Sequence, residues 1–180
     1  MARPKKKIKK SKVKKITPKK RAVKKKISET KADEPIFLQP PRGMKDALPE
    51  EQPFWDQVRK VSERAARDYG FLRIDTPILE YSNLFARSIG EGTDIVEKEM
   101  YGFVTRGGDR VSLRPELTAG ICRAYIQHGM NVYPKPVKLF SIGPVYRYER
   151  PQEGRYREHH QVNFDAFGEQ DPILDAQVIQ

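Results

Sequence analysis

The distribution of charge along the chain limits what each part of it can fold into. Residues 1–31 contain 16 of the 35 Lys and Arg residues and one acid, Glu29, so their net charge is +15. The chain of 180 residues has a net charge of +11, which leaves −4 for residues 32–180. So many lysines with so few apolar side chains cannot bury enough surface to offset the entropy lost on ordering. We therefore predict a disordered Lys-rich tail, residues 1–34, and a folded domain, residues 35–180.

Two functions remain open for this tail. Its lysines suit non-specific binding to RNA, because each lysine that displaces a counterion from a phosphate gains entropy from the release. A solubilising extension explains the same composition. No aromatic side chain lies among residues 1–31, so stacking on bases is not expected.

Composition also excludes several classes of protein. No apolar run approaches the roughly 18 residues of a membrane span, and the first 30 residues do not resemble a secretory or organellar leader. The single cysteine, Cys122, excludes an internal disulfide and a Cys-based zinc site. His159 and His160 are adjacent and so point to opposite sides of a strand, an arrangement that argues against a metal site there. We expect a cytoplasmic protein with no membrane partner.

The hydrophobic pattern of the folded domain predicts helices and strands in alternation. Apolar residues recur at helical spacing from Pro53 to Tyr69, and Gly70 ends this helix. Residues 100–105 and 110–113 are expected to be strands joined by a Gly-rich turn. The other expected elements are strands at 71–74, 137–142, 144–149 and 159–167, and helices at 83–89, 115–129 and 172–180. Strands joined by hairpins around isolated helices indicate an α+β fold, an antiparallel sheet flanked by helices.

Residues 143–169 carry the densest polar pattern. Alternation along a strand predicts that Arg147 and Glu149 share one face. In the next strand it predicts that polar side chains share a face, namely those of Gln161, Asn163 and Asp165. The loop between these strands contains three arginines, Arg150, Arg155 and Arg157. Because arginine matches phosphate and carboxylate oxygens in pairs, this set suits a ligand with phosphates at one end and an amine or imidazole at the other.

Structural explanations are open for the same residues. The polar rows could be solvated strand faces with surface ion pairs. Glu116 and Thr118 lie near the expected start of a helix, where capping would account for both.

Three segments resemble a known family. They are Arg42 to Pro49 (RGMKDALP), Leu113 to Gly120 (LRPELTAG) and Gly143 to Arg157 (GPVYRYERPQEGRYR). They resemble the N-terminal half of the catalytic domain of histidyl-tRNA synthetases, which are class II aminoacyl-tRNA synthetases. The resemblance covers residues 36–180 and does not extend to the tail. Residues 74–80 resemble the family's first motif, and Pro77 would then lie at a homodimer interface.

The resemblance implies roles for individual residues. Arg147 would be the catalytic second-motif arginine, which binds the substrate carboxylate and the α-phosphate of ATP. The implied ATP contacts also include Glu149, Arg155 and His159, and the implied histidine contacts are Glu116, Thr118, Arg147, Gln161 and Asp165. Arg150 and Gln152 would approach the tRNA acceptor end.

The implied activity is ATP-dependent formation of histidyl-adenylate and transfer of histidine to tRNA(His), with magnesium on the ATP and no tightly bound cofactor. The family's third motif and anticodon-binding domain are expected after Gln180, so the class II core is expected to be incomplete here. Two alternatives are a regulatory paralogue that acts with ATP phosphoribosyltransferase, and a nucleic-acid-binding module driven by the tail.

Overall fold

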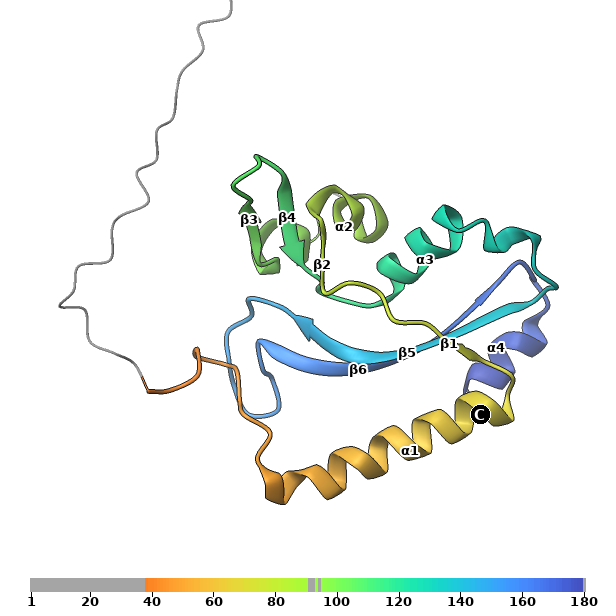
Figure 1. Ribbon diagram of the computed structural model, residues 1–180, viewed down its shortest axis with the longest axis horizontal. Helices are drawn as coiled ribbons and strands as arrows, with labels where there is room; N and C mark the ends of the chain where they lie inside the picture. The colour runs from red at the N-terminus through yellow and green to blue at the C-terminus, as the bar shows by residue number, and fades with distance from the viewer. Residues whose placement is uncertain (1–37, 91–92, 94, 180) are drawn as a thin grey trace, which may run out of the picture. The chain divides into compact units, whose positions relative to one another are not determined.

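The computed structural model describes residues 38–90, 93 and 95–179 (Figure 1). These residues belong to the unit Phe37–Gln180. The Lys-rich tail and its boundary at residue 34 lie outside the described residues and stay predictions.

Strands of the described part form two three-stranded sheets. The first has the order β1 (Leu72–Arg73), β5 (Val137–Tyr146), β6 (Glu158–Phe167). Strands β5 and β6 are antiparallel over ten residue pairs, from Val137 opposite Phe167 to Tyr146 opposite Glu158, whereas β1 is parallel to β5. The second sheet is antiparallel, with the order β2 (Leu79–Tyr81), β4 (Arg110–Leu113), β3 (Gly102–Val104).

Helices cover both faces of the first sheet. In Figure 1, α1 (Gln52–Asp68) runs along one side of β5 and β6, and α3 (Thr118–Gln127) lies on the other side. The other helices are α2 (Ser82–Ile89), α4 (Pro172–Ile179), the 3-10 turns η1 (Pro49–Glu51) and η3 (Met130–Val132), and the π-helical turn η2 (Ile95–Glu99). Among the described residues, no helix is long and apolar enough to cross a membrane.

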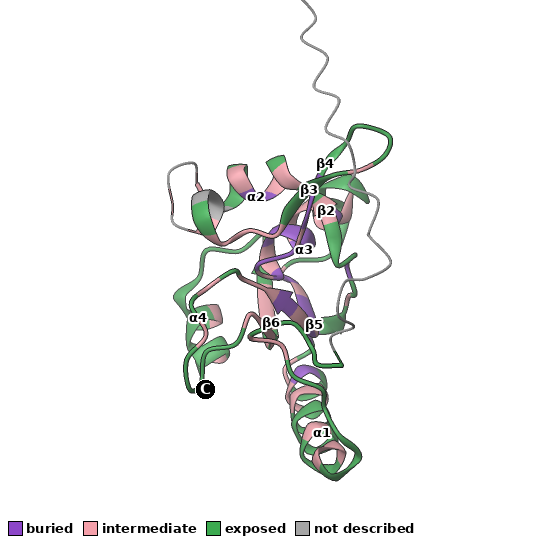
Figure 2. Ribbon diagram, turned by 90° about the vertical axis from the view of Figure 1, so that its left-hand side faces the viewer, coloured by how far each residue is buried: buried purple, intermediate pink, exposed green. Residues whose placement is uncertain are grey.

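The core lies on both faces of β5 (Figure 2). Toward α3, Leu117 and Ile121 pack with alternate residues of β5, namely Val137, Leu139 and Val145. Toward α1, Phe140 packs with Ala66 and Phe71, and Phe164 of β6 borders this cluster. A strand buried on both faces is continuously apolar, as residues 137–145 largely are.

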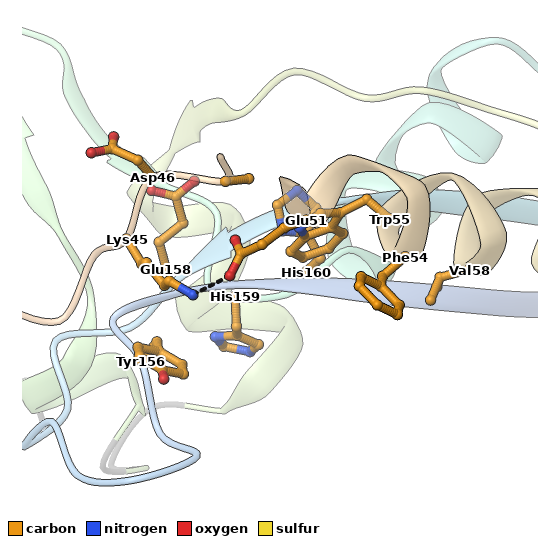
Figure 3. Close-up of a pocket in the computed structure, with 11 residues that line it drawn as sticks. Lys45, Asp46, Glu51, Phe54, Trp55, Val58, Tyr156, Glu158, His159 and His160 are labelled. Atoms are coloured by element: carbon orange, nitrogen blue, oxygen red, sulfur yellow. Dashed lines mark hydrogen bonds and ion pairs between the residues drawn. The ribbon is translucent and has the colours of Figure 1, made fainter. Parts of the chain in front are cut away.

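The N-terminal half of α1 borders a hollow of about 710 Å³ beside the start of β6 (Figure 3). Trp55 contacts His160 there, with ring centroids 4.6 Å apart. The ion pair between Lys45 and Glu51 crosses the hollow's rim.

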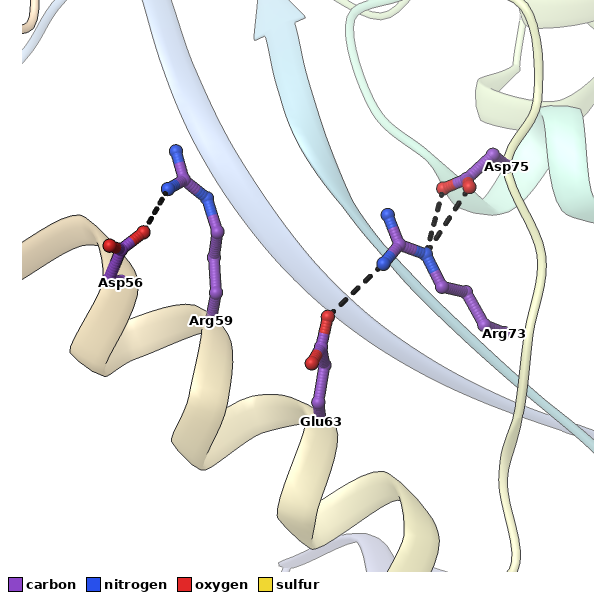
Figure 4. Close-up of polar contacts among 5 residues, drawn as sticks. All are labelled: Asp56, Arg59, Glu63, Arg73 and Asp75. Atoms are coloured by element: carbon purple, nitrogen blue, oxygen red, sulfur yellow. Dashed lines mark hydrogen bonds and ion pairs between the residues drawn. The ribbon is translucent and has the colours of Figure 1, made fainter. Parts of the chain in front are cut away.

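One exposed ion pair joins the C-terminal half of α1 to β1, and others lie beside it (Figure 4). Arg73 Nη1 lies 3.1 Å from Glu63 Oε1, and Arg73 Nε lies 3.2 Å from Asp75 Oδ2. Asp56 and Arg59 pair within the helix at 2.9 Å. Exposed pairs contribute little to stability, so the apolar cluster around Phe140, not these pairs, holds α1 on the sheet.

The α+β class and the helix at residues 52–68 are confirmed, and the main differences from the expectation are these. Residues 137–149 do not form two strands: β5 continues through Pro144 and ends at Tyr146. The third helix begins at Thr118, not at Pro115, and the strand expected at 71–74 is limited to residues 72–73. The parallel pairing of β1 with β5 makes the first sheet mixed.

Because β5 ends at Tyr146, the prediction that Arg147 and Glu149 share a strand face is wrong. The Arg147 amide donates to the carbonyl of Arg157 at 2.8 Å, and the Tyr148 amide donates to the carbonyl of Glu99 at 2.6 Å. The first bond joins the residues that follow next in the β5–β6 register, whereas the second joins Tyr148 to a residue outside that sheet, so the chain leaves the ladder after Arg147.

Candidate active site

The polar face predicted for residues 161–165 is confirmed, and it meets the N-terminus of α3. Asn163 Nδ2 donates to Thr118 Oγ1 at 2.7 Å. Thr118 Oγ1 in turn donates to Asp165 Oδ1 at 3.2 Å. The two strand residues and the first residue of α3 thus form one hydrogen-bonded chain. On the opposite face of β6, His160 and Phe164 point toward α1.

Glu116 caps α3. Its Oε2 accepts the Thr118 amide at 2.6 Å and its Oε1 accepts the Ala119 amide at 2.8 Å. A carboxylate at this end satisfies free amides and faces the positive end of the helix dipole. The capping explanation left open for Glu116 is therefore correct. Thr118 makes side-chain bonds to β6 instead.

Two buried acceptors of β6, Asp165 Oδ2 and Gln161 Oε1, have no hydrogen-bond partner among the described residues. Burial raises the pKa of Asp165; the hydrogen bonds from Thr118 and Asn163 oppose this, and nearby Glu116 adds to it. An unpaired buried acceptor costs free energy. A ligand that brings N–H groups or a positive charge would remove this cost.

The cysteine side chain lies next to the same cluster. Cys122 follows Thr118 by one helical turn, and its pKa is raised by burial and then by the charges of Asp165 and Glu116. A thiol with a raised pKa stays neutral and is a poor nucleophile. We therefore assign Cys122 no chemistry.

Arg147 connects this acceptor cluster with the loop that follows β5. Its Nε donates to the carbonyl of Pro115 at 2.9 Å, one residue before Glu116. The pKa of His159 is lowered by burial and then by the positive charge of Arg147, while Glu149 opposes the shift. The charges of Arg147 and Glu149 thus act on His159, although both residues lie beyond the end of β5.

The loop itself is closed by a tight turn. The amides of Gln152 and Arg155 each bond the other residue's carbonyl, at 3.2 and 2.9 Å. Arg155 Nη1 lies 3.3 Å from Glu149 Oε2, and the arginine side chain is 66% exposed. Arg150 and Gln152 are exposed. This loop therefore presents the cations of Arg150 and Arg155 to solvent.

The family is decided by the match of residues 43–180 to the model of histidyl-tRNA synthetase. The chain belongs to the histidyl-tRNA synthetase family. The histidine–tRNA ligase of Dehalococcoides mccartyi (strain 195) is 58% identical over 142 residues, which cover 79% of this chain and 34% of the relative. The chain therefore spans about a third of the length of the curated relatives it matches.

Solved structures of histidyl-tRNA synthetases share the fold. The apo enzyme of S. aureus has a TM-score of 0.66 at 35% identity, covering 79% of this chain and 32% of that one. A protein of Bacillus halodurans described as an ATP phosphoribosyltransferase regulatory subunit/histidyl-tRNA synthetase has a TM-score of 0.68 at 25% identity, covering 81% and 36%.

The synthetase fold gathers most of the predicted site residues into two adjoining groups. The first is the acceptor cluster of Glu116, Thr118, Gln161 and Asp165. The second consists of Arg147, Glu149, Arg155 and His159, and the loop adds Arg150 and Gln152. Pro77 lies apart, exposed between β1 and β2. The hollow beside α1 shares only His159 with the predicted residues.

Three contributors to this site had no assigned role. Asn163 shares the alternation of Gln161 and Asp165, and that pattern could have identified it. Arg114 is 6% exposed and donates to the carbonyls of Thr76 and Pro144, at 2.8 and 2.9 Å. Arg157 is expected from the sequence to act with the other loop arginines, Arg150 and Arg155, and no local pattern separates it from them. Among the described residues, no group of three or more His, Cys, Asp or Glu side chains could hold a metal ion.

Proposed function

We propose that this chain supplies part of the active site of an enzyme that activates histidine with ATP and transfers it to tRNA(His). The observation that carries the proposal is the pair of unpartnered buried acceptors, Asp165 Oδ2 and Gln161 Oε1, beside Arg147. A free amino acid with an imidazole brings N–H donors for the acceptors and a carboxylate for the arginine.

In this proposal the acceptor cluster binds histidine. Asp165 accepts from an imidazole N–H, and its fixed position follows from the bond it receives from Thr118. Gln161, Glu116 and Thr118 hold the amino group. An analogue without the imidazole N–H would leave a buried carboxylate unpaired, which gives strong discrimination.

ATP, as its magnesium complex, would lie over the second group. Arg147 neutralises the histidine carboxylate and the α-phosphate, Glu149 meets the adenine amino group and His159 stacks on adenine. Arg155 binds the outer phosphates, and its ion pair with Glu149 opens as ATP enters. An oxygen of the histidine carboxylate attacks the α-phosphorus, the bond to the β-phosphate oxygen breaks, and pyrophosphate leaves.

Histidyl-adenylate then reacts with tRNA. A terminal ribose hydroxyl attacks the activated carbonyl, AMP leaves, and Arg150 and Gln152 approach the acceptor end. No protein nucleophile is required, so positioning and charge neutralisation supply most of the rate enhancement.

We further propose a cytoplasmic homodimer. Helix α1 keeps apolar side chains in solvent, with Phe54 75%, Val58 49% and Val61 57% exposed, and Leu72 on β1 is 67% exposed. Together with exposed Pro77 these residues would form the interface. Sedimentation equilibrium tests this, because Phe54→Ser should weaken self-association if the partner covers α1.

The function is tested by ATP–pyrophosphate exchange with each of the twenty amino acids, using the longest natural form of the chain. We expect exchange with histidine alone. Absence of exchange together with stimulation of an ATP phosphoribosyltransferase would establish the regulatory function instead. Arg147, Glu149 and Arg155 argue against that outcome, since a regulatory subunit has no need to bind ATP phosphates.

A further inference from the structure

Besides Arg147, three arginines lie in the loop between β5 and β6, and their environments differ. Arg150 and Arg155 are exposed, whereas Arg157 is partly buried against the main chain. Arg157 also lacks a carboxylate within ion-pair distance among the described residues, unlike Arg155, which pairs with Glu149. The contacts of this arginine are therefore with backbone carbonyls and an aromatic ring.

Arg157 contacts each residue of the segment Arg147–Glu149. Its Nε donates to the carbonyl of Glu149 at 3.0 Å, and its guanidinium carbon lies 3.8 Å from the centre of the Tyr148 ring. Its own carbonyl accepts the Arg147 amide at 2.8 Å. A guanidinium over an aromatic face adds cation–π attraction. One residue therefore fixes the backbone on both sides of Tyr148.

The turn at Arg42 and Gly43 holds Arg157 from the other side. The Gly43 carbonyl accepts the Arg157 amide at 2.6 Å, and Arg157 Nη1 lies 3.4 Å from the carbonyl of Arg42. Gly43 has a φ of +85°, and a Cβ there would lie 2.9 Å from Arg157 Cγ. Only glycine both adopts this conformation and leaves room for the arginine stem.

We propose that Arg157 is a positioning residue for ATP, which aligns Arg147 and Glu149 by stacking on Tyr148 and bonding the Glu149 carbonyl, and that the turn at Gly43 holds it there. This inference rests on the proposed function of Arg147 and Glu149. It separates the three loop arginines: Arg155 faces the phosphates and Arg150 the tRNA, while Arg157 contacts neither substrate and acts through the main chain.

The test is ATP–pyrophosphate exchange by Arg157→Met, Arg157→Lys and the control Arg106→Met in the longest natural form of the chain. Arg106 is an exposed arginine in the turn between β3 and β4. We expect Arg157→Met to raise the Michaelis constant for ATP roughly 10- to 100-fold and to leave that for histidine within about 3-fold. Arg157→Lys should restore little, because an ammonium lacks the planar fork.

A glycine pair tests the turn independently. Gly43→Ala should reproduce the ATP defect, since its Cβ would lie 2.9 Å from both Arg157 Cγ and Pro151 Cγ and so displace the Arg157 stem or the loop that it holds. Gly108→Ala is the matched control: its φ is +94°, so the backbone strain is similar, but nothing lies within 4 Å of an added Cβ. This pair keeps the proposal testable if Arg157→Met does not fold.

Amide hydrogen exchange of residues 147–149 without ligand separates this inference from the proposed function. Faster amide exchange in Arg157→Met than in Arg106→Met supports the positioning role. This holds even if the wild-type chain shows no histidine-dependent ATP–pyrophosphate exchange, a result that would refute only the proposed function. Equal amide exchange, an unchanged Michaelis constant for ATP, or equal rises in both Michaelis constants would overturn the positioning role.

Discussion

Thr118 donates its hydroxyl hydrogen to Asp165 at 3.2 Å, which joins the first residue of α3 to a strand residue 47 positions later. The bond occupies one carboxylate oxygen, and the other is buried without a partner in the part of the chain that the structure describes. Asp165 is thereby held in one orientation with one acceptor available. This is the arrangement expected of a side chain that accepts a hydrogen bond from a ligand N–H.

Asp165→Ala should therefore impair the use of histidine much more than the use of ATP. Loss of a hydrogen bond to a charged group costs about 1.5–3 kcal/mol, so the Michaelis constant for histidine should rise roughly 10- to 150-fold. Steady-state kinetics of pyrophosphate exchange measure both constants. Asp175→Ala, on the exposed face of α4, is the control. Equal rises for histidine and ATP would mean that Asp165 serves only the fold.

His160 should titrate below the ordinary histidine range. Its pKa is lowered by burial first, with smaller contributions from the charges of Arg59 and Arg114, against an opposing effect of Glu158. Trp55 is the single tryptophan of the chain and contacts His160, so its fluorescence should report the protonation. We expect a titration midpoint below 6.5, lost in His160→Gln and retained in His128→Gln. A midpoint at or above 6.5 would contradict a pKa lowered by partial loss of hydration.

The same shift predicts how stability depends on pH. A histidine whose folded pKa is lowered binds its proton more weakly in the folded state than in the unfolded state. The free energy of unfolding should consequently fall as the pH drops below about 6.5, and His159, whose pKa is also lowered, acts in the same direction. Urea unfolding at pH 7.5 and 5.5 measures this. His160→Gln should lose less stability between the two, and an unchanged difference would exclude His160 as a contributor.

Residue 143 should tolerate only glycine, because the buried guanidinium of Arg114 occupies the space that a side chain would need. A Cβ at residue 143 would lie 2.5 Å from Arg114 Nη2, so Gly143→Ala should destabilise the chain by about 1–3 kcal/mol. In the Arg114→Met background the same substitution should cost much less. A double-mutant cycle by urea unfolding measures this coupling. Additive effects would show that Gly143 is needed for another reason.

The tail should strengthen RNA binding without changing which tRNA is chosen. Lysines on residues 1–31 would contact phosphates, which carry no sequence information. Deleting these residues should flatten the slope of log affinity against log salt concentration. Filter binding with tRNA(His) and an unrelated tRNA measures slope and preference together. An altered preference with an unaltered slope would show that the tail reads sequence.

Local patterns predicted some parts of this molecule and could not predict others. Alternation along residues 158–167 placed Gln161 and Asp165 on one face correctly, because a strand's side-chain period is local. The end of β5 was not predictable in this way. Just beyond it the Tyr148 amide bonds the carbonyl of Glu99, outside the β5–β6 ladder, and this partner is set by a tertiary contact.

Burial was the other property that local pattern did not reveal. Arg114 is a charged residue inside the fold, where backbone carbonyls replace its hydration. Phe54, Val58 and Val61 follow helical spacing, yet all three are exposed. The spacing predicted the helix correctly, but periodicity gives no information on what covers an apolar face.

The most direct test of the central claim is histidine-dependent ATP–pyrophosphate exchange by the wild-type chain and by Arg147→Ala, in its longest natural form. Loss of a charge-assisted contact made in the transition state should cost about 2–4 kcal/mol. We therefore predict a fall in exchange of about 30- to 1000-fold in Arg147→Ala and near-normal exchange in the control Arg106→Ala. Exchange at the wild-type rate in Arg147→Ala would contradict the assignment of this site to histidine activation.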